Sequence, residues 1–159
     1  MALYSCAARC PAITSENSTP LVELQSSPTD YLRVVDVFGS VIGESSQTFV
    51  LGLGVPASRG VLRKTSPVFV PADVNSVPSQ SVFGTEWTTQ PTIPTKFFRR
   101  LTRASGGNTS QMMQLFSFFL ANGFMMPPST SFVLWLISGQ GTLGYGNPWI
   151  FEPTFDIDA

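Results

Sequence analysis

Histidine is absent from this chain of 159 residues, and charged side chains make up only 12% of it. Without histidine there is no Ser-His-Asp triad, no imidazole general base and no zinc site of the protease type. The charged fraction is about half of that in a typical soluble domain, so the surface has few of the charges that keep a monomer in solution. This is a first indication of a subunit that assembles with others.

Cysteine is also scarce, since the chain has only Cys6 and Cys10. A metal site would need further cysteine or histidine ligands, so we expect two reduced thiols, with a small disulfide loop as the alternative. The first residues lack the charged start and the apolar block of a secretion signal. Residues 1–20 have few candidate core residues, and they are expected to form an extended N-terminal arm on a domain of residues 21–159.

Two classes of partner are disfavoured. The formal net charge is −1, so the chain has no excess of positive charge to attract nucleic acid. A membrane span needs ~20 uninterrupted apolar residues. The apolar stretch 112–137 does not reach this length, because several polar residues and Pro127-Pro128 interrupt it. We expect neither a nucleic-acid partner nor a membrane.

The hydrophobic residues recur with a period of two, which is typical of strands. Leu32, Val34 and Phe38 are predicted to share one strand face, and residues 131–138 are apolar on both faces. Short strands at regular spacing with turn signals between them predict a single all-β sandwich. Strands are expected at residues 21–25, 31–42, 47–55, 61–62 (a brief pairing), 96–103, 111–120 (where a helix is the alternative), 131–138 and 149–155. Residues 68–70 lie between two prolines and can form only an edge strand or an extended linker.

Residues 71–94 interrupt this pattern with many Pro, Ser and Thr residues and one apolar patch around Phe83 and Trp87. We interpret the segment as an ordered excursion that is pinned by Trp87. A disordered linker is the alternative interpretation.

Charge is unevenly distributed along the chain. Residues 59–103 carry seven basic and two acidic groups, whereas the 48 residues from Ala104 to Phe151 carry no charged group. A sandwich with a free surface places charges at the outward positions of its strands. The charge-free run therefore predicts that the outward faces of the later strands are covered by another subunit or by a large partner surface.

No set of residues indicates catalysis or a cofactor. Residues 139–144 have Gly-x-Gly-x-x-Gly spacing, but Pro148 disfavours the helix that a dinucleotide site requires. Glu44, Asp73 and Glu86 could act as a carboxylate pair, as in glycosidases, yet nothing in the sequence brings them together. The sequence predicts a protein that is not an enzyme and that holds no cofactor and no metal.

A basic cluster follows the excursion, beside two consecutive phenylalanines. A solvated strand, a patch that docks on an acidic protein surface and a site for single-stranded nucleic acid are the alternative interpretations. The residues predicted to dock on an acidic partner are Arg99, Arg100 and Arg103, with Lys96 nearby.

The C-terminal half has more aromatic residues than one core of this size needs. Subunit interfaces favour aromatic side chains and methionine. The residues predicted to make core or self-association contacts are Met113, Phe132, Trp135 and Trp149.

Several segments follow one another in a distinctive order along the chain. They are LRVVDVF (32–38), VLGLGVPA (50–57), TSPV (65–68), TEWTTQPTIP (85–94), FFRR (97–100), GFMMPP (123–128) and SFVLW (131–135). This order resembles that in small virion proteins of tailed phages, including cyanophages. The similarity covers roughly residues 20–155 and is a pattern of packing and turn residues. It implies an all-β protein that decorates or cements a capsid, commonly as a trimer, and it implies no catalytic residue.

These observations together predict a jelly-roll-like β-sandwich that assembles on a viral shell. The expected partners are the major capsid protein and further copies of the chain, with a trimer favoured, and the expected location is the capsid surface of the virion after synthesis in the host cytoplasm. The alternative is a tail or fibre protein, or a head–tail connector, that binds a host-surface glycan or a neighbouring virion protein. Aromatic, Asp and Asn side chains around the loop 139–147 would favour the glycan.

Overall fold

The computed structural model describes residues 3–5, 8–10, 18–41, 48–63, 70–71, 79–104, 113–118, 123–140 and 149–158. These residues form fourteen strands and no helix, so the predicted all-β class is confirmed. The strands are β1 (Leu3–Ser5), β2 (Ala8–Cys10), β3 (Thr19–Gln25), β4 (Tyr31–Val41), β5 (Thr48–Gly54), β6 (Val61–Leu62), β7 (Val70–Pro71), β8 (Val82–Gly84), β9 (Trp87–Thr89), β10 (Arg99–Ala104), β11 (Met113–Ser117), β12 (Phe124–Met126), β13 (Ser131–Gln140) and β14 (Trp149–Asp158).

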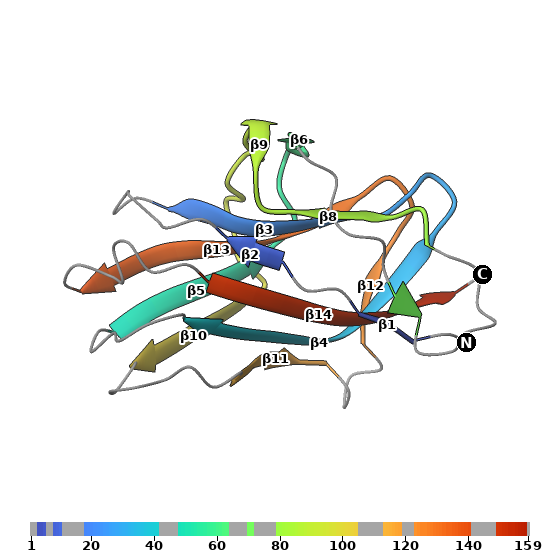
Figure 1. Ribbon diagram of the computed structural model, residues 1–159. Helices are drawn as coiled ribbons and strands as arrows, with labels where there is room; N and C mark the ends of the chain where they lie inside the picture. The colour runs from blue at the N-terminus through green and yellow to red at the C-terminus, as the bar shows by residue number, and fades with distance from the viewer. Residues whose placement is uncertain are drawn as a thin grey trace.

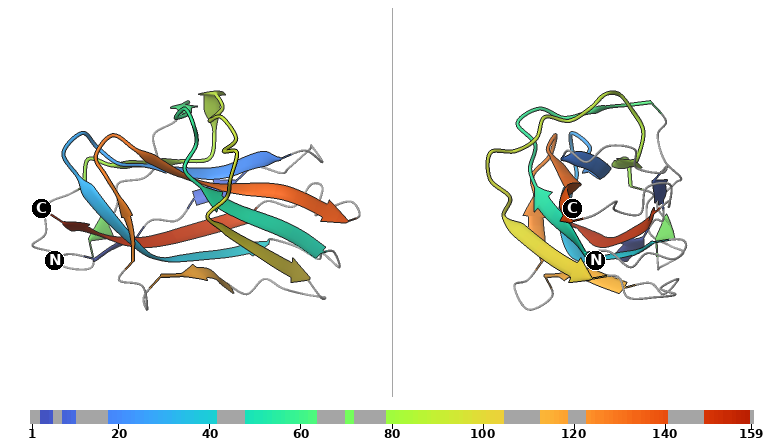
Figure 2. Two further views of the ribbon diagram at one scale, coloured as in Figure 1. Left: turned by 180° about the vertical axis from the view of Figure 1, so that it is seen from behind. Right: turned by 90° about the vertical axis from the view of Figure 1, so that its left-hand side faces the viewer.

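The strands form two layers that face each other (Figure 1). One is a five-stranded sheet in the order β10-β5-β13-β3-β8. The other is a seven-stranded sheet in the order β11-β4-β14-β1-β7, in which β12 also pairs with β4 and β2 with β14. A small ribbon of β6 and β9 projects from the body on the side of the five-stranded sheet (Figures 1 and 2). The architecture is a β-sandwich, and its jelly-roll subtype stays a prediction.

All the strand pairs are antiparallel, and three sets of them are nested, although β4 also pairs with β14 along its length. β3 pairs with β13, β4 with β12 and β11, and β5 with β10, so successive strands of the first half meet strands of the second half in reverse order. Leu3–Ser5 and Ala8–Cys10, which were assigned to an N-terminal arm, pair with β14. The described part of residues 1–10 is thus hydrogen-bonded into the seven-stranded sheet of its own chain.

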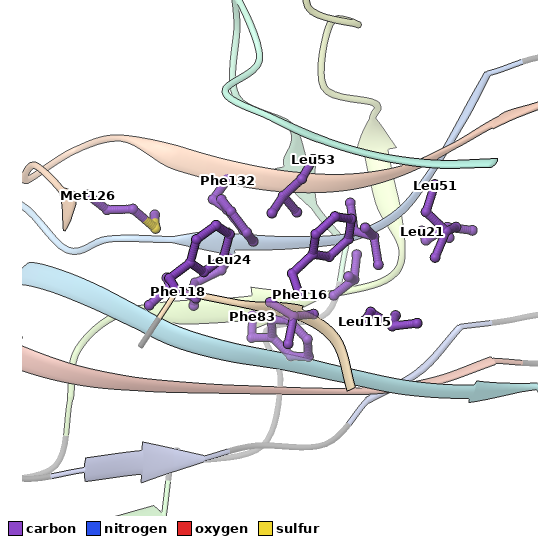
Figure 3. Packing of buried hydrophobic residues seen from close by; sticks show 14 of the residues in the cluster. Leu21, Leu24, Leu51, Leu53, Phe83, Leu115, Phe116, Phe118, Met126 and Phe132 are labelled. Carbon is purple, nitrogen blue, oxygen red and sulfur yellow. The ribbon is translucent and has the colours of Figure 1, made fainter. Parts of the chain in front are cut away.

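The core lies between the two sheets, where buried side chains from both interdigitate (Figure 3). On β13 the inward residues are Phe132, Leu134 and Leu136, as the alternation predicts. They meet Leu51 and Leu53 of β5, and β4 contributes its own apolar face from the opposite sheet. The burial of apolar area between two such faces is the main stabilising contribution in a sandwich.

The inward face of β4 changes partway along the strand. Leu32 and Val34 are buried as predicted, but the next core residue is Val37, and Phe38 is only partly buried. The register of β4 against β14 shifts between Val34 and Asp36. A β-bulge adds one residue to one strand and so reverses which residues face inward beyond it. The prediction that Phe38 shares the inward face of Leu32 is therefore wrong.

The outward face of β13 is also buried, and the cover belongs to the same chain. Val133 and Trp135 are 0% and 2% exposed, and their cross-strand neighbours on β5 are Gly54 and Gly52. A Cβ atom on Gly52 would lie 2.7 Å from the ring of Phe97. The chain's own residues thus cover this face at Val133 and Trp135, which corrects the prediction that another subunit covers the charge-free strand.

Glu23 of the five-stranded sheet forms hydrogen bonds with residues that lie over its outward face. Its side chain is fully buried on the outward face of β3, opposite Val133. The backbone N–H of Gly60 donates to Oε1 at 3.1 Å, and the indole Nε1–H of Trp87 donates to Oε2 at 2.7 Å. Gln25 adds a bond from Nε2 to the carbonyl oxygen of Gly60 at 2.9 Å. The prediction that Trp87 pins the excursion is confirmed for residues 79–94, whereas residues 72–78 lie outside the described residues.

Asp30 organises one end of the sandwich. The hydroxyls of Ser79 and Ser81 donate to its Oδ2 at 3.2 and 3.0 Å, and the hydroxyl of Thr29 donates to Oδ1 at 3.2 Å. Partial burial by itself would raise the pKa of Asp30, but hydrogen bonds from Ser27, Ser81, Thr29 and Ser79 outweigh burial and hold that pKa below its ordinary value of 3.8. The carboxylate thereby joins the turn after β3 to the segment before β8.

The first prediction concerns Trp135. Replacement by alanine is expected to lower the free energy of unfolding by about 3–5 kcal/mol, because a buried indole is lost and a cavity remains. Urea unfolding at two protein concentrations measures it. A core role predicts the same loss at both concentrations. The control is Tyr31→Ala, at an exposed position, which should change stability by less than about 0.5 kcal/mol. A loss that appears only at high concentration would assign Trp135 to a subunit interface.

The second prediction concerns Asp30→Asn. Because the carboxyl pKa is lower in the folded chain, its stabilisation is complete above the ordinary value of 3.8 and is lost as the pH falls through the folded pKa. We expect a difference of at most about 1 kcal/mol near neutral pH, since solvent screens a partly exposed group. Unfolding free energies of the two proteins should converge below about pH 4. Ser81→Ala should weaken this pH dependence, and a difference that grows on acidification would contradict the assignment.

Candidate docking surface

The predicted docking arginines lie together on β10, one of the two outer strands of the five-stranded sheet. Arg99 pairs with Leu53 and Arg100 with Gly52, so the two side chains start from opposite faces of the strand. Both are exposed, as is Lys96. Arg103 occupies the same strand opposite Phe49, and its side chain lies outside the described residues.

Two consecutive phenylalanines hold the start of β10 from both sides. Phe97 packs on the outward face of the sheet, over Gly52 and Gly54, where side chains would leave no room for it. The guanidinium of Arg100 lies over the Phe97 ring, 5.4 Å from its centroid, in a cation–π contact. Phe98 turns to the other side, and its backbone N–H donates to the carbonyl oxygen of Leu53 at 3.1 Å.

Phe98 is the exposed member of an aromatic cluster that reaches into the core. Its ring stacks on Phe124 with centroids 4.5 Å apart and an interplanar angle of 14°. Phe118 and Phe132 follow at 5.9 and 6.2 Å from Phe98, and both are buried. The Phe98 side chain remains 39% exposed. The cluster therefore presents an aromatic surface that is fixed from beneath by the core.

We define the docking surface as Lys96, Phe98, Arg99 and Arg100, with the partly exposed Phe124 beneath Phe98. The sequence has no Asp or Glu between Glu86 and Glu152, so no acidic residue of that span neutralises the three exposed cations. An aromatic surface bordered by arginine is typical of the energetic centre of protein interfaces. Its charge favours an acidic partner.

Two of the four residues predicted to make core or self-association contacts are buried within this chain. Phe132 and Trp135 point to opposite faces of β13 and are both buried in this chain, so they are core residues and offer no area to a second copy. The core alternative of that prediction therefore applies to Phe132 and Trp135. Met113 begins β11 and Trp149 begins β14, and their side chains lie outside the described residues.

Of the remaining predicted features, the structure describes only some. Cys10 is buried, and burial raises the pKa of its thiol to about 12, which makes it unreactive at neutral pH. Cys6, Glu44, Asp73 and most of the loop 139–147 lie outside the described residues. Within the part of the chain that is described, no three His, Cys, Asp or Glu residues are grouped as metal ligands. The same part has no helix with the length and hydropathy to cross a membrane.

Neither a comparison with protein-family models nor one with curated proteins finds a match for this chain.

The third prediction separates the exposed end of the aromatic cluster from its buried end. Phe98→Ala is expected to lower the free energy of unfolding by about 1–1.5 kcal/mol, the contribution of aromatic pairing at a partly exposed position. Phe132→Ala should cost about 3–5 kcal/mol, because Phe132 is buried. Both are measured by urea unfolding. Equal losses in the two variants would show that Phe98 is a core residue rather than a surface residue available to a partner.

Proposed function

We propose that this chain is a virion structural protein that decorates or cements the capsid of a tailed phage. In this function it binds the major capsid protein through the docking surface, bridges neighbouring shell subunits and acts as a homo-oligomer, with a trimer favoured. It catalyses no reaction, binds no nucleic acid and resides on the capsid surface.

The observation that carries the proposal is the docking surface itself. Lys96, Arg99 and Arg100 present positive charge on a protein whose net charge is −1. Phe98 adds an exposed aromatic ring that the core holds in place. A rigid aromatic anchor loses little side-chain entropy on binding, and the charges select an acidic partner. The resemblance of residues 20–155 to small phage virion proteins suggests that this partner is the major capsid protein.

The mechanism is mechanical. Packaged DNA pushes outward on a shell, and each bound subunit that contacts two shell proteins adds interface area that must be broken before they separate. A β-sandwich suits this role because backbone hydrogen bonds join the strands within each of its two sheets. On the outward face of the five-stranded sheet, Gly60 and Trp87 also donate hydrogen bonds to Glu23.

Copy number in purified particles is the first test. Quantitative mass spectrometry should find this chain in amounts close to those of the major shell protein if it decorates or cements the capsid. A few copies per particle would contradict decoration and favour the tail, fibre or connector alternative. Absence from particles would contradict every virion role.

The fourth prediction concerns the binding of the docking surface to isolated shells. The double variant Arg99→Glu/Arg100→Glu should bind isolated shells at least ~10-fold more weakly than the wild-type chain, because reversed charges repel an acidic partner. Arg63→Glu is the matched control, since Arg63 is exposed beside β6, away from β10. We expect the control to bind as the wild type does. Equal weakening by both variants would indicate non-specific attraction and not a defined surface.

A further inference from the structure

The edges of the two sheets differ in how they are protected. β7 has two residues, one of them a proline, and β8 has three residues. β11 has five residues with an irregular register against β4. Short length, proline and bulges are the usual means of protecting an edge from further pairing. Three of the outer strands are therefore poor templates for an added strand.

β10 differs from these edges. It pairs with β5 over six consecutive residues, Arg99 to Ala104, with no register shift. Within the described residues it has no strand partner on its other side. Its regular register along β5 leaves a row of backbone N–H and C=O groups directed away from the sheet. β10 is thus the regular, extended edge of the described fold.

The start of this edge is also fixed in place before any partner arrives. Phe97 clamps it on the outward face and Phe98 on the inward side, where the ring stacks on Phe124. A strand that is already ordered loses less conformational entropy when another strand is added to it.

The charge of β10 selects the occupant. Arg99 and Arg100 are exposed on opposite faces of the strand. A second copy of β10 added to this edge would bring the arginines of both copies side by side, and like charges on neighbouring strands repel. An extended segment with acidic side chains on both of its faces would instead meet a cation on each face.

We propose that β10 accepts an acidic, extended segment of a partner protein as an additional strand of the five-stranded sheet. Backbone hydrogen bonds to the edge would hold the segment, and Arg99 and Arg100 would select its acidic residues. The proposal deepens the function suggested above, because it rests on the same docking surface and specifies how the partner engages it.

The fifth prediction uses the full chain and a fluorescein-labelled octapeptide of Val and Thr with two adjacent Glu residues at its centre. We expect the peptide to bind in a fluorescence anisotropy titration, and the version with Lys in place of Glu not to bind. Arg99→Gln/Arg100→Gln should weaken binding at least ~10-fold, the loss expected when charged contacts to a bound segment are removed. Arg63→Gln should leave binding unchanged.

Two further peptides test strand addition itself. N-methylation of every second residue blocks the backbone bonds along one side of an extended peptide, and methylation of the other residues blocks the opposite side. Strand addition predicts that one of these peptides loses binding while the other keeps it. Hydrogen exchange should also show new protection of the β10 amides in the complex.

Equal binding of both methylated peptides would overturn the proposal, because attraction by charge alone does not distinguish the two sides. Failure of the Glu peptide to bind at low salt would overturn it too. So would tighter, arginine-dependent binding of an oligothymidylate, which would identify a nucleic-acid site. Peptide binding by a chain that is absent from particles would support strand addition and reject the virion role. Shell binding that survives both Gln substitutions would support the virion role and reject β10 as the site of strand addition.

Discussion

The residues that cover the outward face of the five-stranded sheet are held in place by hydrogen bonds to the buried carboxyl group of Glu23. It accepts hydrogen bonds from Gly60, which lies just before β6, and from Trp87 of the excursion. Leaving such a buried donor or acceptor unpaired is costly, so these bonds fix where the cover lies on the five-stranded sheet. Phe97, further along the chain, packs over Gly52, two residues before β10 begins.

This arrangement changes the meaning of the low charge content. β13 is buried on both faces between Ser131 and Leu136, so it has no outward positions at which charges would be expected. The absence of charge there follows from the chain covering its own sheet, and it gives no support to assembly. The proposal of a structural subunit rests instead on the cations of β10, the exposed ring of Phe98 and the resemblance to phage virion proteins.

The longer strands could be predicted from the sequence because a period of two is a local property. β3, β4, β5, β10 and β13 all lie within two or three residues of their predicted positions. Strands of three residues, such as β1, β2 and β12, were missed because so short a run shows no period. That Val37 faces the core was not predicted, because a β-bulge depends on how the partner strand pairs and leaves no local pattern. The alternation of Gly52 and Gly54 on one face was an available signal that something packs closely there.

The nested pairing has a consequence for how the chain folds. β3 gains its long neighbour only when β13 arrives, since Glu23 pairs with Val133. Domains dominated by such distant contacts have high contact order and fold slowly, in about milliseconds to seconds, because loop closure precedes the contacts that reward it. During that interval the apolar strand β3 has no long partner and is open to association with other chains. The rate of folding relative to aggregation is therefore set by the last third of the sequence.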